Sequence, residues 1–196
     1  MRTVVGITGA SGTIYGVRLL ETILGSKTVI VSADAAKLAK TELGISKRDI
    51  YALADEHFEN DDLEAPISSG SVRFDSMVIA PCTTSTMSKI SCGIADNLIT
   101  RAASVALKER RRLVILIRET PLSTIHLWNM ERLSAAGATI MPACPAFYPK
   151  PKKVDEVVDF VVGRVLDELG MENSLYSRWA GKKGPTYNRG SRRTRR

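Results

Sequence analysis

The chain opens with an apolar run that ends in a turn rich in glycine and hydroxyl groups, Val4-Val5-Gly6-Ile7-Thr8-Gly9-Ala10-Ser11-Gly12. Apolar residues then recur at helical spacing from Ile14 to Leu24. The pattern predicts a buried strand, a tight loop and a helix whose amino end meets an anion, because backbone N–H groups and the positive end of the helix dipole lie there. The glycine spacing matches neither a dinucleotide site nor a P-loop and favours a mononucleotide phosphate. A tight turn that binds nothing would need the same glycines.

A second strand is predicted over residues 27–32, which are apolar enough to be buried on both faces of a parallel sheet. A dinucleotide-binding fold usually places an acid at the end of this strand. Ser32 stands there instead, with Asp34 two residues later, so NAD is disfavoured. Helices are predicted over residues 33–43, which carry Glu42, and over residues 47–58, followed by an acidic loop over residues 59–64.

A second hydroxyl-rich turn, Pro81-Cys82-Thr83-Thr84-Ser85-Thr86-Met87-Ser88, follows a strand predicted over residues 76–80 and opens a helix. A further strand over residues 113–117 ends at Arg118 and Glu119. Thr120 is the expected N-cap of the next helix, with Pro121 at its first position. Carboxyl ends of parallel strands meet at one edge, so these groups are predicted to gather beside the first loop, where open α/β sheets bind ligands.

The remaining pattern completes an α/β fold. A helix over residues 97–108 carries Arg101 and Lys108, a short strand covers residues 138–141, and a proline-rich connector over residues 142–151 fixes Tyr148. The last helix, residues 154–169, has Arg164 beside its apolar stripe, where a guanidinium reaching out to solvent is the simpler interpretation. We therefore predict a single Rossmann-like, three-layer α/β domain over residues 1–180, with a parallel central sheet and helices on both faces.

Charge is concentrated at the carboxyl end. The chain has 196 residues, 44% of them hydrophobic, and a net charge of +7. Residues 181–196 are rich in lysine and arginine and contain no acid, which leaves residues 1–180 balanced. This tail is predicted to be disordered. Nucleic acid is not expected as a partner, because a basic tail permits salt-sensitive binding but no base recognition. Without a long apolar run, the chain is expected to be a soluble cytoplasmic protein that does not enter a membrane.

Cysteine and histidine are too sparse to indicate a metal. Cys82, Cys92 and Cys144, with His57 and His126, lack metal-ligand spacing, so no metal site is predicted. Buried, unreactive thiols are expected instead. Neither histidine accompanies a nucleophile elbow, which argues against a Ser-His-Asp hydrolase.

An ordered set of motifs resembles the UbiX-type flavin prenyltransferases over residues 1–180. These motifs are Gly9-Ala10-Ser11-Gly12, Pro81-Cys82-Thr83-Thr84-Ser85-Thr86, Ala106-Leu107-Lys108-Glu109-Arg110-Arg111, Arg118-Glu119-Thr120-Pro121-Leu122-Ser123, Pro145-Ala146-Phe147-Tyr148 and Arg178-Trp179. The resemblance implies a dodecameric homo-oligomer that binds reduced FMN and dimethylallyl phosphate. It implies an enzyme that joins the dimethylallyl group to flavin N5 and C6, giving prenylated FMN for a UbiD-type decarboxylase.

The same resemblance assigns individual residues. Flavin-binding positions fall on Gly9, Ala10, Ser11, Ser32, Thr83, Thr84, Ser85, Thr86 and Arg118. Prenyl-phosphate positions fall on Lys108, Tyr148 and Arg164, with Arg101 nearby, and the active-site acids on Glu42 and Glu119. Lysine, arginine and a phenol can neutralise a leaving phosphate without a metal. A carboxylate with a nearby hydroxyl, such as that of Ser11, can manage the proton lost from C6, and Trp179 could shield a carbocation with its ring face.

Two other interpretations remain open at this point. One is an FMN-dependent decarboxylase of an aromatic acid or a peptidyl cysteine, although the cysteine-directed kind would be expected to carry a histidine base near its flavin. The other is a carrier of flavin or nucleic acid that uses the tail.

Overall fold

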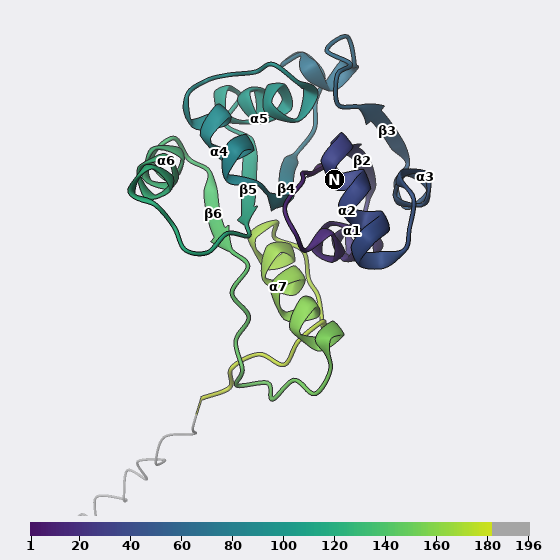
Figure 1. Ribbon diagram of the computed structural model, residues 1–196, viewed down its shortest axis with the longest axis vertical. Coiled ribbons are helices and arrows are strands. Elements are labelled where there is room, and N and C mark those ends of the chain that lie inside the picture. Colours follow the sequence, from purple (N-terminus) through teal and green to yellow (C-terminus); the bar gives the residue numbers. More distant parts are fainter. Residues whose placement is uncertain (182–196) are drawn as a thin grey trace, which may run out of the picture.

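A computed structural model describes residues 1–181, which form one six-stranded parallel sheet covered by helices on both faces (Figure 1). The strands are β1 (Arg2–Ile7), β2 (Ser26–Val31), β3 (Glu56–Glu59), β4 (Ser76–Cys82), β5 (Arg112–Ile117) and β6 (Thr139–Pro142). Their order is β3-β2-β1-β4-β5-β6, and each neighbouring pair is parallel. The predicted parallel α/β fold is therefore confirmed.

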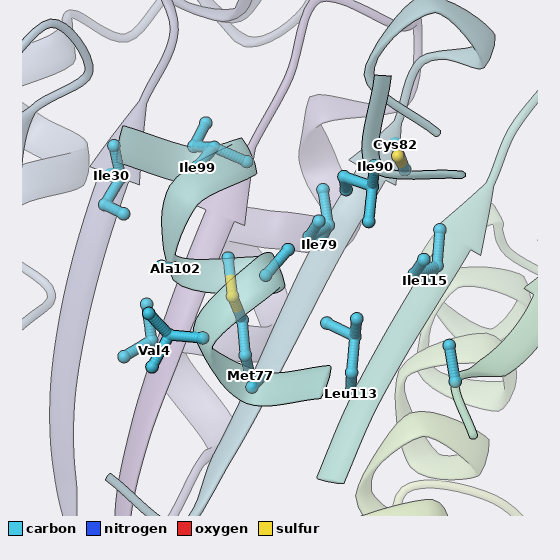
Figure 2. Close-up of a cluster of buried hydrophobic side chains, with 14 of the residues drawn as sticks. Val4, Ile30, Met77, Ile79, Cys82, Ile90, Ile99, Ala102, Leu113 and Ile115 are labelled. Atoms are coloured by element: carbon cyan, nitrogen blue, oxygen red, sulfur yellow. The ribbon is translucent and has the colours of Figure 1, made fainter. Parts of the chain in front are cut away.

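Two apolar layers sandwich the sheet. On one face, α4 (Thr84–Ser91), α5 (Leu98–Lys108) and α6 (Thr124–Ala135) pack on alternate strand residues, among them Val4 and Met77. Figure 2 shows Ile99 and Ala102 of α5 among these strand side chains. The other face is covered by α1 (Thr13–Thr22), α2 (Ala33–Leu43), α3 (Lys47–Tyr51) and α7 (Val154–Glu168). Successive strand side chains point to opposite faces, so a strand buried on both sides is apolar throughout.

Glycine at position 16 brings α1 directly onto the sheet. A Cβ there would overlap the carbonyl oxygen of Ala80 and lie 2.8 Å from Cδ1 of Ile7. The helix that follows the first loop is thereby held between β1 and β4, so the loops after both strands lie side by side.

The helix predicted over residues 47–58 is wrong in its second half. The segment α3 ends at Tyr51, and residues 56–59 form the edge strand β3, paired with β2. A single side chain of this strand, that of Phe58, is packed against the core, so the strand carries almost no apolar signal. A backbone hydrogen bond from the N–H of Asp55 to the carbonyl of Lys27 brings the segment to the sheet edge.

Two further expectations are corrected. The helix after β5 begins at Thr124, not at Pro121, because Ser123 is its N-cap and forms a capping box with His126. Of the three cysteines, Cys82 is buried, and burial raises the pKa of its thiol, but Cys92 and Cys144 are exposed. The predicted tail lies outside the described residues except for Gly181. Within residues 1–181, no helix has the length and apolar character needed to cross a membrane.

Candidate functional site

Thr8 joins the two hydroxyl-rich loops at the carboxyl edge of the sheet. Its N–H and its hydroxyl both donate to the carbonyl of Pro81, at 3.1 and 2.8 Å. Its hydroxyl oxygen in turn accepts from the N–H of Thr83 at 2.8 Å. Thr8 is buried, so these bonds are shielded from water and fix the loop after β1 against the loop after β4.

A cavity of about 230 Å³ lies between these loops. Its lining residues are Thr8, Gly9, Ser32, Asp34, Asn60, Thr83, Ser85, Thr86, Asn97 and Ile99. Three of them, Ser32, Thr83 and Asn97, are the N-caps of α2, α4 and α5. The positive ends of three helix dipoles therefore point towards one cavity whose lining contains no lysine or arginine. This arrangement favours a phosphate bound by backbone N–H groups and hydroxyls.

The amino end of α4 is the best candidate for the phosphate contact. Thr83 accepts from the N–H of Thr86 at 3.0 Å, whereas the N–H groups of Thr84 and Ser85 have no acceptor within residues 1–181. The first N–H groups of α5, by contrast, already donate to Asn60, through its backbone oxygen at 2.7 Å and its side chain at 3.1 Å. An anion in the cavity would thus bind at α4, with the hydroxyls of Ser85 and Thr86 beside it.

The amino end of α1 meets an anion from the protein itself. The carboxylate of Glu42, on α2, accepts from the N–H groups of Gly12 and Thr13, both at 3.0 Å, and from the Thr13 hydroxyl at 2.8 Å. Burial alone would raise the pKa of Glu42. Hydrogen bonds from the Ser11 and Thr13 hydroxyls and from both N–H groups outweigh this effect, so the pKa lies below its ordinary value. The sequence predicts a phosphate at this helix end, and in the structure the Glu42 carboxylate accepts from its first N–H groups.

Arg118 connects β5 to the first loop. Its Nε donates to the backbone oxygen of Ser11 at 2.8 Å. Tyr15 lies close to both Arg118 and Cys144, and its phenol has a raised pKa because burial and the Cys144 thiol oppose ionisation more than the guanidinium favours it. Ser11, Glu42 and Arg118 are thus brought together at one end of the site. Glu119, the next residue, is exposed, and its carboxylate accepts from the N–H of Thr120 at 3.0 Å.

Tyr148 and Arg164 belong to a separate group on and beside α7. The ring of Tyr148 makes edge contacts with Phe160, at 5.9 Å between centroids, and with Trp179, at 5.4 Å. Arg164 is exposed one turn after Phe160 and pairs with Asp167 at 3.1 Å. Both predicted phosphate ligands are therefore accessible, on the face of the sheet that α1 and α7 cover.

Arg101 and Lys108 form a third group, on α5. Arg101 donates to the carbonyl of Ser68 at 2.9 Å, and Lys108 pairs with Glu109 beside Gly70. Since α5 and α7 cover opposite faces of the sheet, the structure does not bring these two cations together with Tyr148 and Arg164 within one chain.

Sequence reasoning found part of the cavity and missed part of it. Gly9, Ser32, Thr83, Ser85 and Thr86 line it, while Ala10, Ser11, Thr84 and Arg118 lie outside its lining. The missed polar residues are Thr8, Asp34, Asn60 and Asn97. Thr8 and Asn97 could have been suspected, because each stands where a predicted strand ends or a predicted helix begins. Nothing local marks Asn60, which reaches α5 from the loop after β3.

The flavoprotein family model matches residues 1–166. The flavin prenyltransferase UbiX of Thermoplasma acidophilum is 55% identical over 180 residues, which cover 91% of this chain and all of that protein. A crystal structure of AnUbiX (PadA1) in complex with FMN and dimethylallyl pyrophosphate has a TM-score of 0.90 at 42% identity, covering 92% of this chain and 97% of the other. A dodecameric FMN-dependent UbiX-like decarboxylase from Escherichia coli O157:H7 also has a TM-score of 0.90, at 45% identity and with 92% and 100% coverage.

A parallel sheet with hydroxyl-rich loops at its carboxyl edge is thus the scaffold of a flavoprotein, and this chain is an FMN-binding protein of that class. Within that class it belongs to the UbiX-type flavin prenyltransferases, which makes it a transferase.

Proposed function

We propose that the chain transfers the dimethylallyl group of dimethylallyl phosphate to reduced FMN, whose phosphate occupies the cavity between the Gly9 and Thr83 loops. The observation that carries this assignment is the cavity itself, where α2 and α4 begin at hydroxyl N-caps and Thr84 and Ser85 offer N–H groups. These are the donors that a phosphate monoester needs. Gly9 supports the proposal because it lets the loop backbone pass close to Asp34 at the cavity wall.

The reaction breaks the carbon–oxygen bond between the dimethylallyl group and phosphate while a carbon–nitrogen bond forms at flavin N5. The N5 proton leaves in this step. The double bond of the attached group then takes up a proton, its tertiary carbon bonds to C6 to close the new ring, and the C6 proton leaves. The first step needs neutralisation of phosphate charge, which Lys108, Tyr148 and Arg164 can supply, with Arg101 nearby. The second needs a proton acceptor, for which Glu119 is the exposed carboxylate at the end of β5, while Glu42 and Ser11 shape the loop beside it.

The donor site is proposed to form between copies of the chain. Lys108 and Arg164 lie on opposite faces of one sheet, separated by two helix–sheet layers of about 10 Å each. A homo-oligomer removes this obstacle, because a neighbouring copy can bring its α5 to the α7 of the first. A dodecameric relative supports such an assembly for this chain.

Two further parts of the proposal rest on the family alone. The recipient of prenylated FMN is a UbiD-type decarboxylase, and the enzyme works in the cytoplasm. Both follow from the prenyltransferase assignment and fail with it.

The experiment that tests the function is the mass of the flavin extracted after anaerobic incubation with reduced FMN and either dimethylallyl phosphate or the pyrophosphate. We expect a flavin heavier than FMN by one dimethylallyl group with at least one donor, and only FMN when the donor is omitted. The name of the Escherichia coli relative keeps direct decarboxylation as a second candidate. Unmodified flavin together with carbon dioxide released from an added aromatic acid would establish that candidate and overturn ours.

A further inference from the structure

The segment that follows α7 turns back along that helix, and one carboxylate holds it there. We call residues 171–179 the C-terminal strap; Figure 1 shows it returning beside α7 towards the proline-rich connector. The strap contains Trp179, whose ring lies against Tyr148. Its position therefore decides what surrounds one of the proposed phosphate ligands.

Asp167, near the end of α7, is the centre of the contact. Its carboxylate accepts from the Tyr176 hydroxyl at 2.6 Å, from Arg178 at 2.7 and 3.2 Å, and from the Asn173 side chain at 2.9 Å. Arg164 donates to the same carboxylate at 3.1 Å. Only 14% of the Asp167 side chain is exposed, compared with 44% for Arg164 and 59% for Arg178. A nearly buried acid thus holds two guanidiniums whose outer faces remain accessible.

The packing beneath this contact is specific to the strap. A Cβ at Gly163 would lie 2.6 Å from the ring of Tyr176, so the absence of a side chain there lets the tyrosine rest on α7. Tyr176 also makes an edge contact with Phe160 at 4.8 Å, and Phe160 in turn contacts Tyr148. A continuous chain of contacts therefore runs from Asp167 to the proposed phosphate ligand Tyr148.

We infer that Asp167 is a positioning residue for the prenyl-phosphate site: it orients Arg164 directly, and by fastening the strap it holds Tyr148 and Trp179 in place. Glu168 also lies 3.9 Å from Arg164, so two carboxylates face the two arginines and Asp167 contributes the orientation of the guanidinium towards an incoming phosphate, not an excess of charge. This inference rests on the proposed function, because the donor phosphate gives the oriented arginine its role.

The test compares Asp167→Asn with Asp159→Asn. Asp159 is the matched control, since it lies on the same helix, is half-buried at 22% exposure and binds the guanidinium of Arg18 at 2.7 Å, but faces α1 instead of the strap. For Asp167→Asn we expect KM for dimethylallyl phosphate to rise about tenfold or more, the loss of a charge-assisted hydrogen bond, with a smaller change in kcat and unchanged FMN affinity. Asp159→Asn should leave KM near the wild-type value, although both variants lose an ion pair.

Two more variants keep the test decisive if Asp167→Asn folds poorly. Asp167→Glu retains the charge and should recover part of the lost affinity, and Tyr176→Phe removes one hydrogen bond while keeping the ring, so its KM should be intermediate. Strap order is read independently from the fluorescence anisotropy of Trp179 in a Trp128→Phe background, which leaves one tryptophan. We expect faster local motion of Trp179 when Asp167→Asn is added to that background.

An unchanged KM in Asp167→Asn, with a wild type that makes prenylated flavin, would overturn the positioning role alone. Lower Trp179 anisotropy in Asp167→Asn without a change in KM would overturn it as well. Asp167 would then hold the strap in place, but the strap would have no effect on donor binding. A wild type that makes no prenylated flavin from either donor would refute the proposed function and this inference together.

Discussion

The carboxylate of Glu42 lies 2.8 Å from the hydroxyl oxygen of Thr13, so a side chain from α2 closes the amino end of α1. The same carboxylate accepts from the N–H groups of Gly12 and Thr13, at the end of the first loop. Because these N–H groups already have an acceptor, we propose the phosphate site at the neighbouring loop, beside Thr83.

Replacing Glu42 with glutamine should lower stability in a pH-dependent way. The folded-state pKa of Glu42 lies below its ordinary value of 4.5, so ionisation favours the folded state above that value, and the stabilisation is lost as the pH falls through the folded pKa. At pH 7 we expect Glu42→Gln to cost about 0.3–1 kcal/mol, the worth of a charge at a helix amino end. Denaturation at fixed protein concentration, at pH 7 and at pH 3.5, measures this difference in the free energy of unfolding. The control is Glu172→Gln, at an exposed position. An equal loss at both pH values would contradict the charge assignment.

Gly9→Ala should impair FMN binding through one contact. A Cβ at residue 9 would lie 2.6 Å from the Cβ of Asp34, so the loop or the start of α2 must move at the cavity wall. We expect FMN affinity to fall about tenfold, the loss of roughly one good hydrogen bond to phosphate. Adding Asp34→Gly removes the opposing Cβ and should restore binding, while Asp34→Gly alone serves as the control. A double variant as weak as Gly9→Ala would show that the overlap is not the cause.

The sequence predicts the sheet well because its central strands are buried on both faces. Residues 29–31 and 113–117 are apolar throughout, which is the signature of parallel strands under two helical layers. The edge strand β3 lacks that signature: the side chains of Glu56, His57 and Glu59 are exposed, so the segment resembles the end of a polar helix. Residues 56–59 form a strand because they pair with β2, and local sequence periodicity does not reveal such a pairing with a distant strand.

The candidate site is predicted only in part for a related reason. The hydroxyl residues Ser32 and Thr83 indicate where two helices begin. Helices that begin directly after parallel strands start at the carboxyl edge of the sheet. The sequence does not state which face of the sheet a crossover helix covers, so the separation of Lys108 from Arg164 emerges only in three dimensions. The contact of Glu42 with the first loop also depends on the tertiary fold. About thirty residues separate Glu42 from Gly12 and Thr13, whose N–H groups donate to it.

Trp128→Ser should weaken the assembly of copies. The amino half of α6 and the turn before it expose Leu122, Ile125, Leu127 and Trp128, with Trp128 at 63%. Apolar side chains gathered in this way on one helix mark an interaction surface, and an aromatic side chain is a common anchor. We expect Trp128→Ser to shift the protein to smaller species in size-exclusion chromatography with light scattering, and Trp128→Phe to keep the wild-type mass. An unchanged mass for Trp128→Ser would place the subunit contacts elsewhere.

Glu119→Gln and Lys108→Ala should fail at different steps. Lys108→Ala removes a charge-assisted contact of about 1.5–3 kcal/mol to the leaving phosphate, so formation of both prenyl bonds should slow together. Glu119→Gln should still bind FMN and the donor but accumulate a flavin bonded to the prenyl group at N5 only, because loss of the C6 proton is slowed. Rapid-mixing absorbance of the reduced flavin separates the two cases. A Glu119→Gln protein that closes the ring at the native rate would refute its role.

Mixing two inactive variants should restore activity if the donor site lies between copies. Lys108→Ala and Arg164→Ala each remove one phosphate ligand, and each homogeneous assembly then lacks that ligand at every site. In a randomly mixed assembly, a site that takes its lysine and its arginine from different chains has about one chance in four of receiving both intact residues. We therefore expect about a quarter of the wild-type rate after the variants are dissociated together and reassembled in equal amounts.

The matched control mixes Lys108→Ala with a Lys108→Ala/Arg164→Ala double variant, which cannot rebuild an intact site and should stay inactive. Mass spectrometry of the reassembled oligomer verifies that the chains have exchanged. If fully exchanged Lys108→Ala and Arg164→Ala chains remain as inactive as the control, both ligands must come from one chain. That outcome would require α5 and α7 to reach one phosphate within a protomer, against the placement of these helices on opposite faces of the sheet.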